Sequence, residues 1–127
     1  MKIPSMKIPF VRVDHVQLSM PEGEDERARQ FYCEILGLQE LPRPSDMAGR
    51  GGGWFSSGSV SVHLGVERPF QAAKKAHPAF VCTDYEKLLE RLSEHGVAIT
   101  PAEASPEGKA RCHVSDPFGN RIELIAS

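Results

Sequence analysis

The sequence predicts an α+β fold made of two consecutive units, each with the element order β-α-β-β-β. Stretches in which apolar and polar residues alternate, as in half-buried strands, recur at similar intervals in both halves of the chain. Each half also has one segment with helical apolar spacing, placed directly after its first strand. In addition, His15 and His63 are separated by nearly the same number of residues as His77 and Glu123. These three observations indicate an internal repeat.

The first unit is expected over about residues 11–66, after an N-terminal arm at residues 1–10. The alternation in "VRVDHVQLSM" predicts its first strand from Val11 onward. A helix is predicted from about Glu24 to Leu36, because apolar side chains recur three and four residues apart. Gly37 is suited to end that helix, because glycine adopts positive φ without strain. Three further strands are predicted from the pieces "LGLQELP", "WFSS" and "VSVHLGVE".

The second unit is expected over about residues 77–126, after a linker at residues 67–76. Its first strand is "HPAFVCT", and its later strands are "VAIT", "KARCHVS" and "RIELIA", with a turn at "DPFGN" before the last. Thr83 followed by Glu86 has the spacing of a capping box, which predicts a helix beginning near Asp84. The two units together are expected to form a single domain over residues 11–127.

Composition excludes several classes of function. The net charge is −2 and no basic stripe is present, so nucleic acid is not an expected partner. No apolar run approaches the roughly 20 residues that span a bilayer, and the N-terminus lacks a secretory signal. The cysteines are odd in number and widely spaced, which favours reduced, mostly buried thiols at Cys33, Cys82 and Cys112. We therefore expect a cytoplasmic protein without a membrane partner.

Strand parity places four side chains with metal-binding chemistry where they can share one site. These residues are His15, His63, His77 and Glu123. If each helix covers the apolar face of its own sheet and the sheets curl toward each other, the four side chains meet in a concave site. Three imidazoles and a carboxylate suit Zn, Ni, Co, Mn or Fe(II). Four protein ligands would leave two positions of a six-coordinate ion for two substrate oxygens.

Other residues are candidates for the wall of this cleft. Gln17 lies on the strand face of His15, and His113 shares a face with Arg111, which is suited to bind an anionic substrate. Trp54 would line the cleft or pack in the core. The glycine-rich loop over residues 43–53 precedes a strand rather than a helix, so it is not a phosphate-binding loop. We expect it to be a mobile lid over the cleft.

Five segments of the chain resemble the vicinal oxygen chelate superfamily. They are "DHVQL", "FYCEILGL", "VHLGV", "HPAFVCTD" and "DPFGNRIELI". This superfamily includes glyoxalase I, methylmalonyl-CoA epimerase, extradiol dioxygenases, fosfomycin-resistance enzymes and bleomycin-resistance proteins. The resemblance implies the glyoxalase-like fold, in which the curved sheets of two βαβββ modules form a shared metal-binding cleft. It also implies a homodimer, with the paired modules from one chain or from two.

The resemblance implies that the same four residues are the metal ligands, since they match the family's positions on the first and last strands of each module. His63 departs from glyoxalase I and the epimerases, where a carboxylate or an amide is usual. Dioxygenases and fosfomycin enzymes use two histidines and a glutamate, matched by His15, His77 and Glu123. His63 would then be an added ligand or a substrate contact. Arg43 is a doubtful match for the arginine of the glutathione-using glyoxalases.

The sequence therefore predicts a metalloenzyme that chelates a small oxygenated substrate on a divalent ion. Lyase or isomerase chemistry and dioxygenase chemistry both remain open. Glu123 is the expected general base in the first case and an iron ligand in the second. The alternative is a metal-free protein that sequesters a ligand, as bleomycin-resistance proteins do. In that case the protein would bind its ligand without catalysing a reaction.

Overall fold

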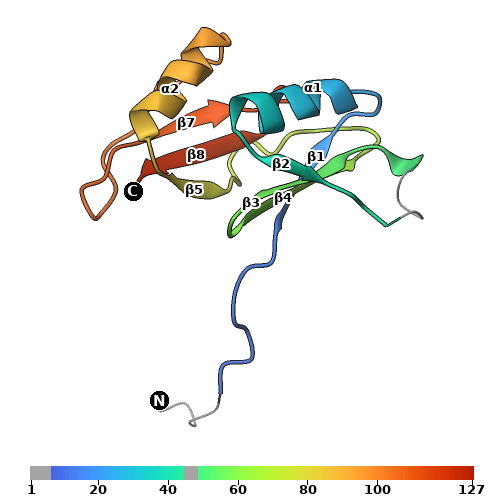
Figure 1. Ribbon diagram of the computed structural model, residues 1–127, viewed down its shortest axis with the longest axis horizontal. Helices are drawn as coiled ribbons and strands as arrows, with labels where there is room; N and C mark the ends of the chain where they lie inside the picture. The colour runs from blue at the N-terminus through green and yellow to red at the C-terminus, as the bar shows by residue number, and fades with distance from the viewer. Residues whose placement is uncertain (1–6, 45–48) are drawn as a thin grey trace.

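Two four-stranded sheets with helical segments on one side make up the fold of the protein (Figure 1). The computed structural model describes residues 7–44 and 49–127. Sheet A contains, in spatial order, β1 (Val16–Met20), β4 (Val60–Val66), β3 (Gly53–Ser57) and β2 (Gln39–Leu41). Sheet B contains β5 (Ala79–Cys82), β8 (Arg121–Ala126), β7 (Arg111–Ser115) and β6 (Thr100–Pro101). The predicted pair of βαβββ units is confirmed.

The same strand order recurs in both sheets. The first and last strands of each unit pair in parallel, and the remaining neighbours are antiparallel. Gln17 pairs with His63 in sheet A, and Ala79 pairs with Glu123 in sheet B. His15 and His77 each stand two residues before these paired positions. The repeat therefore holds residue by residue.

The core lies between the helical segments and the inner faces of both sheets. Its most completely buried large side chains are Met20, Tyr32, Phe55, Val62, Leu92, Ile122 and Leu124. Polar contacts also join the two units across this core. The Tyr32 hydroxyl donates to Asp116 Oδ2 at 2.7 Å, and Asn120 Nδ2 donates to the Ser19 carbonyl at 2.8 Å. The turn between β7 and β8 is thereby fixed to the first unit.

The first helical segment is an α-helix that continues as a π-helix, whereas the sequence predicted a single α-helix. It begins as α1 (Asp25–Arg29) and continues as the π-helix η1 (Gln30–Ile35). The amide of Leu36 donates to the carbonyl of Phe31, five residues earlier, at 2.9 Å. Phe31, Tyr32 and Ile35 are all buried, so the π turn keeps the predicted apolar stripe on the core.

The predicted capping box before α2 (Tyr85–Glu94) is wrong. The residue that precedes the helix is Asp84, in the left-handed conformation with φ of 49°, and no side chain caps the helix. Aspartate tolerates this conformation better than most residues. Asp84, in the left-handed conformation, stands between Thr83 and the first turn of the helix. The Thr83 hydroxyl therefore cannot take the capping position. The predicted apolar stripe does face the core, with Leu92 buried and Tyr85, Leu88 and Leu89 packed against the core residues.

Several predicted strands are shorter than expected, and the first strand and the "VAIT" strand differ most. The first begins at Val16 rather than Val11, and only Thr100 and Pro101 of the "VAIT" region and its flank form β6. The register pairs Val16 with Val62, so residues 11–13 would lie beyond the first residue of β4 and have no strand to pair with. This segment extends away from the body instead (Figure 1), with Val11 91% exposed.

Several other expectations concern the arm, the lid and the cysteines. Residues 1–6 of the expected arm and residues 45–48 of the expected lid lie outside the described residues. Cys33, Cys82 and Cys112 are free thiols, and Cys112 is buried. Within the described part of the chain, no helix combines the length and apolar character needed to cross a membrane.

Candidate metal centre

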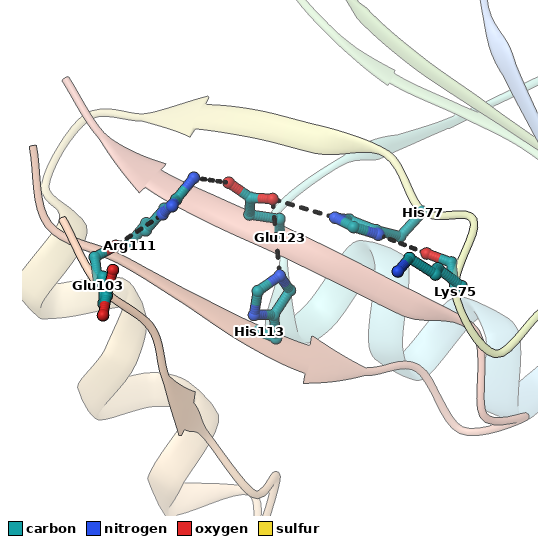
Figure 2. A network of polar contacts seen from close by, with 6 residues as sticks. All are labelled: Lys75, His77, Glu103, Arg111, His113 and Glu123. Carbon is teal, nitrogen blue, oxygen red and sulfur yellow. Dashed lines mark hydrogen bonds and ion pairs between the residues drawn. The ribbon is translucent and has the colours of Figure 1, made fainter. Parts of the chain in front are cut away.

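The candidate metal centre lies on the outer face of sheet B. His113 on β7 pairs with Glu123 on β8, and their strand neighbours Cys112 and Leu124 are buried in the core. Because side chains alternate along a strand, His113 and Glu123 point to the opposite face. His77, just before β5, reaches the same carboxylate from the other side (Figure 2).

Three possible ligand atoms converge at this point. His77 Nε2 lies 3.0 Å from Glu123 Oε1, and His113 Nε2 lies 3.5 Å from the same oxygen. The ligand atoms of these three residues all lie within 4.8 Å of one another. Ligand atoms that share one ion at about 2.1 Å are themselves about 3 to 3.5 Å apart. The distances from Glu123 to His77 and to His113 both lie in this range, so the cluster is a candidate site for a divalent ion.

The hydrogen bonds around His77 direct its Nε2 atom at Glu123. His77 Nδ1 lies 2.7 Å from the carbonyl oxygen of Lys75, which can only accept a hydrogen bond. Nδ1 therefore donates a hydrogen bond to this carbonyl, and Nε2 is directed at Glu123 Oε1, 3.0 Å away. A proton on Nε2 makes this contact a hydrogen bond to the carboxylate, and a bound metal ion would take the place of that proton. A backbone carbonyl of this kind is a common outer partner of a metal-binding histidine.

The charge states of the cluster also suit a metal. The hydrogen bond with His77 lowers the pKa of Glu123 below its usual value against the opposing effect of burial, and Arg111 lowers it further. Burial is the main cause that lowers the pKa of His113. An ionised carboxylate and a neutral imidazole are the forms that bind metal ions.

The other two predicted ligands lie together on sheet A. The rings of His15 and His63 are stacked with centroids 3.8 Å apart, and the Trp54 indole is stacked with His63 at 4.5 Å. Burial, and then the neighbouring His15, lower the pKa of His63. His15 Nδ1 also contacts Asp14 Oδ2 at 2.9 Å. Within one protomer, neither His15 nor His63 belongs to the cluster of ligand atoms on sheet B.

His113 joins the cluster although the sequence identified it only as a cleft residue. It stands three residues before Asp116, and Glu123 stands three residues after Asn120, at the two ends of the "DPFGN" turn. A hairpin closed at this turn places the two residues opposite each other. The equal spacing of His113 and Glu123 from this turn is the sequence feature that predicts their pairing.

The remaining candidates lie near one or the other group. Arg111 Nη1 lies 3.4 Å from Glu123 Oε2, while its Nε donates to the Glu103 carbonyl at 2.6 Å (Figure 2). Arg111 therefore borders the metal cluster, whereas Gln17 and Trp54 flank His63 on sheet A.

The chain is similar to known proteins over most of its length. The family model described as the Glyoxalase/Bleomycin resistance protein/Dioxygenase superfamily matches residues 12–124. The chain is 30% identical over 111 residues to a catechol-2,3-dioxygenase of Bacillus subtilis (strain 168), a match that spans 80% of this chain but only 37% of that protein.

Two solved structures illustrate the range of similar folds. A glyoxalase family protein from Bacillus anthracis has a TM-score of 0.90 and 41% identity, with 96% of this chain and 99% of that chain covered. An antibiotic binding protein from Streptomyces sp. CB03234 has a TM-score of 0.69 and 23% identity, with 94% and 98% covered. The second likeness concerns the fold alone.

Proposed function

Because the chain belongs to the glyoxalase/bleomycin resistance protein/dioxygenase superfamily, we propose that it is a divalent-metal enzyme acting on a small molecule with two neighbouring oxygen atoms. The observation that carries this proposal is the convergence of His77, His113 and Glu123, whose ligand atoms lie within 4.8 Å of one another. A bound Zn, Ni, Co, Mn or Fe(II) ion would act as a Lewis acid toward the substrate oxygens.

Glu123 has two tasks in this proposal. Its Oε1 faces the histidines and its Oε2 faces Arg111, so one oxygen is free of the histidines. In an isomerase or lyase reaction, the carboxylate would accept a proton from the substrate. In a dioxygenase reaction, it would remain a ligand and take no proton. The catechol-2,3-dioxygenase relative supports the second type of reaction, and the short match to that protein keeps both open.

Arg111 would orient the substrate. Its guanidinium is partly exposed and borders the carboxylate, with donors beyond those used by Glu103 and Glu123. We assign it the role of a hydrogen-bond donor to an anionic or developing anionic oxygen of the substrate.

A second copy of the chain would complete the set of ligands expected from the sequence. His15 and His63 occupy the positions in sheet A that His77 and Glu123 occupy in sheet B. Since the four side chains do not gather within one protomer, they would meet only if sheet A of one copy faced sheet B of another. We therefore propose a homodimer in which His15 and His63 of one copy approach His77 and Glu123 of the other.

Metal content measured by elemental analysis after reconstitution tests the proposal. We expect about one ion per chain, and loss of most of it in His77→Ala and Glu123→Gln. His95→Ala, at the exposed end of α2, is the control and should keep its ion. Loss of metal in His113→Ala alone would place all ligands within one protomer, whereas loss in His15→Ala would favour the site between copies. Metal-free protein under all conditions would refute the proposal.

The stacked rings on sheet A favour a second candidate function. His15, His63 and Trp54 form a nearly parallel set of rings, with interplanar angles of 12° and 10°. Such rings suit a flat ligand, which this protein would hold without metal or turnover. Absence of metal together with tight binding of planar compounds would identify this function instead.

A further inference from the structure

Residues 8–13 form a segment that leaves the body of the protein before β1 and extends away from the helices (Figure 1). Its large apolar side chains are between 73% and 91% exposed, namely Ile8, Phe10, Val11 and Val13. No strand in the described part of the chain pairs with this segment, because the pairing of β1 with β4 begins only at Val16. A row of exposed apolar side chains of this kind is typical of a surface that binds another chain.

The free edge of sheet B offers a strand for this segment. β5 is the outermost strand of that sheet, and its one neighbour among the described strands is β8. On the β8 side, the Glu123 amide donates to the Pro78 carbonyl at 2.9 Å. Because backbone groups alternate in direction along a strand, those of Ala79 and Val81 point away from β8. Val81 is also 64% exposed, so the edge carries both free backbone groups and an apolar side chain.

The homodimer proposed above would bring these two surfaces together, and the inference rests on that homodimer. His15 and His77 hold equivalent positions in the two units, so a site between copies would place His15 of one copy beside His77 of the other. Two equivalent strands that face each other across a two-fold axis run antiparallel. In that register, residues 11–13 of one copy lie opposite residues 79–81 of the other.

We propose that residues 8–13 of one copy pair as an added antiparallel strand with β5 of a second copy. The outward backbone groups of β5 then gain hydrogen-bond partners, as when an extended peptide joins the edge of a sheet. Pro9, which has no N–H group, lies opposite Thr83 of the partner subunit. Since β5 ends at Cys82, no hydrogen bond of the ladder is lost there.

The same register places Phe10 at an apolar groove of the second copy. Phe10 lies opposite Cys82 of the partner subunit, and opposite residues of antiparallel strands point to the same face. That face of β5 borders a groove of about 540 Å³ between β5, α2 and the residues after η1. The apolar residues that line it include Leu36, Leu38, Val60, Phe80, Leu88 and Leu124. Phe10 would therefore leave water by entering this groove, on the face opposite to the metal cluster.

Disulfide cross-linking measures the register directly. Opposite residues of an antiparallel pair have Cα atoms about 5.5 Å apart, which suits a disulfide. The double variant Val11→Cys/Val81→Cys should therefore form covalent dimers on oxidation, visible by non-reducing electrophoresis. The control is Val11→Cys/Ser93→Cys, in which the second change lies on the exposed side of α2. Val11→Cys alone accounts for any bond to the native cysteines.

The oligomeric state separates failure of the strand pairing from failure of the homodimer. Sedimentation that shows a dimer, together with cross-linking no greater than in the control, would overturn the pairing and leave the homodimer intact. A monomer at all concentrations would overturn both.

Phe10→Ala tests the placement in the groove. Phe10 is 84% exposed within one protomer, so its truncation should leave the protomer folded. It should raise the dissociation constant of the dimer about tenfold or more, because a large apolar side chain is no longer buried on association. Leu41→Ala, at an exposed apolar residue of β2, is the control and should leave the dimer unchanged. Equal dissociation constants for wild type and Phe10→Ala would overturn this placement.

Discussion

Among the residues that the structure describes, Asp116 is the most completely buried acidic residue, at 4% exposure. Its Oδ2 accepts hydrogen bonds from the Tyr32 hydroxyl at 2.7 Å and from Asn120 Nδ2 at 2.8 Å. Its Oδ1 accepts from the amides of Phe118 and Asn120 at 2.9 and 2.8 Å. A buried carboxylate is tolerated only when its hydrogen bonds are satisfied. The turn and η1 therefore depend on each other.

Replacing Tyr32 with phenylalanine tests this dependence. Tyr32→Phe removes one donor to a buried carboxylate and should lower the free energy of unfolding by about 1 to 3 kcal/mol. Tyr85→Phe, which removes a hydroxyl from a half-buried ring on α2, is the control and should cost less. Urea denaturation measures both. An equal loss in the two variants would mean that the bond to Asp116 carries no special stability.

The same tyrosine predicts how stability changes in alkali. Burial, and then the charge of Asp116, raise the pKa of Tyr32 well above its ordinary value of 10.0. The native state therefore holds this proton more tightly than the unfolded chain does. Its contribution is fully present below about pH 10 and decreases as the pH rises above that value. Urea unfolding from pH 8 to pH 11 should show a steeper loss above pH 10 in the wild type than in Tyr32→Phe; parallel curves would contradict this.

At the level of single elements, the sequence predicted the order of strands and helices better than their bounds, helix type and caps. Alternation identified the strands because one face of each sheet packs against the core. It failed for residues 11–13, since parity cannot reveal where the partner strand begins. The π-helix η1 was also missed, because over six residues an apolar stripe fits an α turn and a π turn equally well. The capping box failed because Asp84 takes the left-handed conformation before α2.

The end of α2 allows a test of backbone strain alone. Gly96 has φ of 75°, and a Cβ atom there would meet nothing within 4 Å. Gly96→Ala should therefore destabilise the protein by about 1 kcal/mol, since only the left-handed backbone penalises the methyl group. Gly49→Ala is the matched control, because Gly49 lacks a positive φ and has equally open surroundings. Thermal unfolding compares them. A harmless Gly96→Ala would show that the helix end relaxes.

At the level of the whole molecule, the sequence identified the candidate ligand residues better than it predicted which of them lie close together. His77 and Glu123 do converge, because their strands are neighbours in one parallel pair. His15 and His63 converge with each other for the same reason. Whether the two pairs meet depends on how one sheet faces another, which no strand pattern contains. His113 was undervalued because its approach to Glu123 depends on the hairpin register rather than on its own surroundings.

Mixing two inactive variants distinguishes a site between copies from one within a copy. One variant carries His15→Ala with His63→Ala, and the other carries His77→Ala with Glu123→Gln. If the site lies between two copies, each variant alone should bind little metal. Joint refolding of equal amounts should then restore it in about half of the sites of the mixed dimers. Full metal binding by the first variant alone would contradict this arrangement and favour His113 as the third ligand.

The contacts between the β7–β8 turn and the first unit have a consequence for chain continuity. Besides the bonds of Tyr32 and Asn120, Arg27 donates to the Pro117 carbonyl at 3.1 Å, so the halves are joined by contacts other than the segment that links them in sequence. Lys74 and Lys75 in that segment are exposed. A protease that cuts there would nick the chain without releasing either half. The protein should accordingly tolerate being produced as two separate polypeptides that assemble with each other.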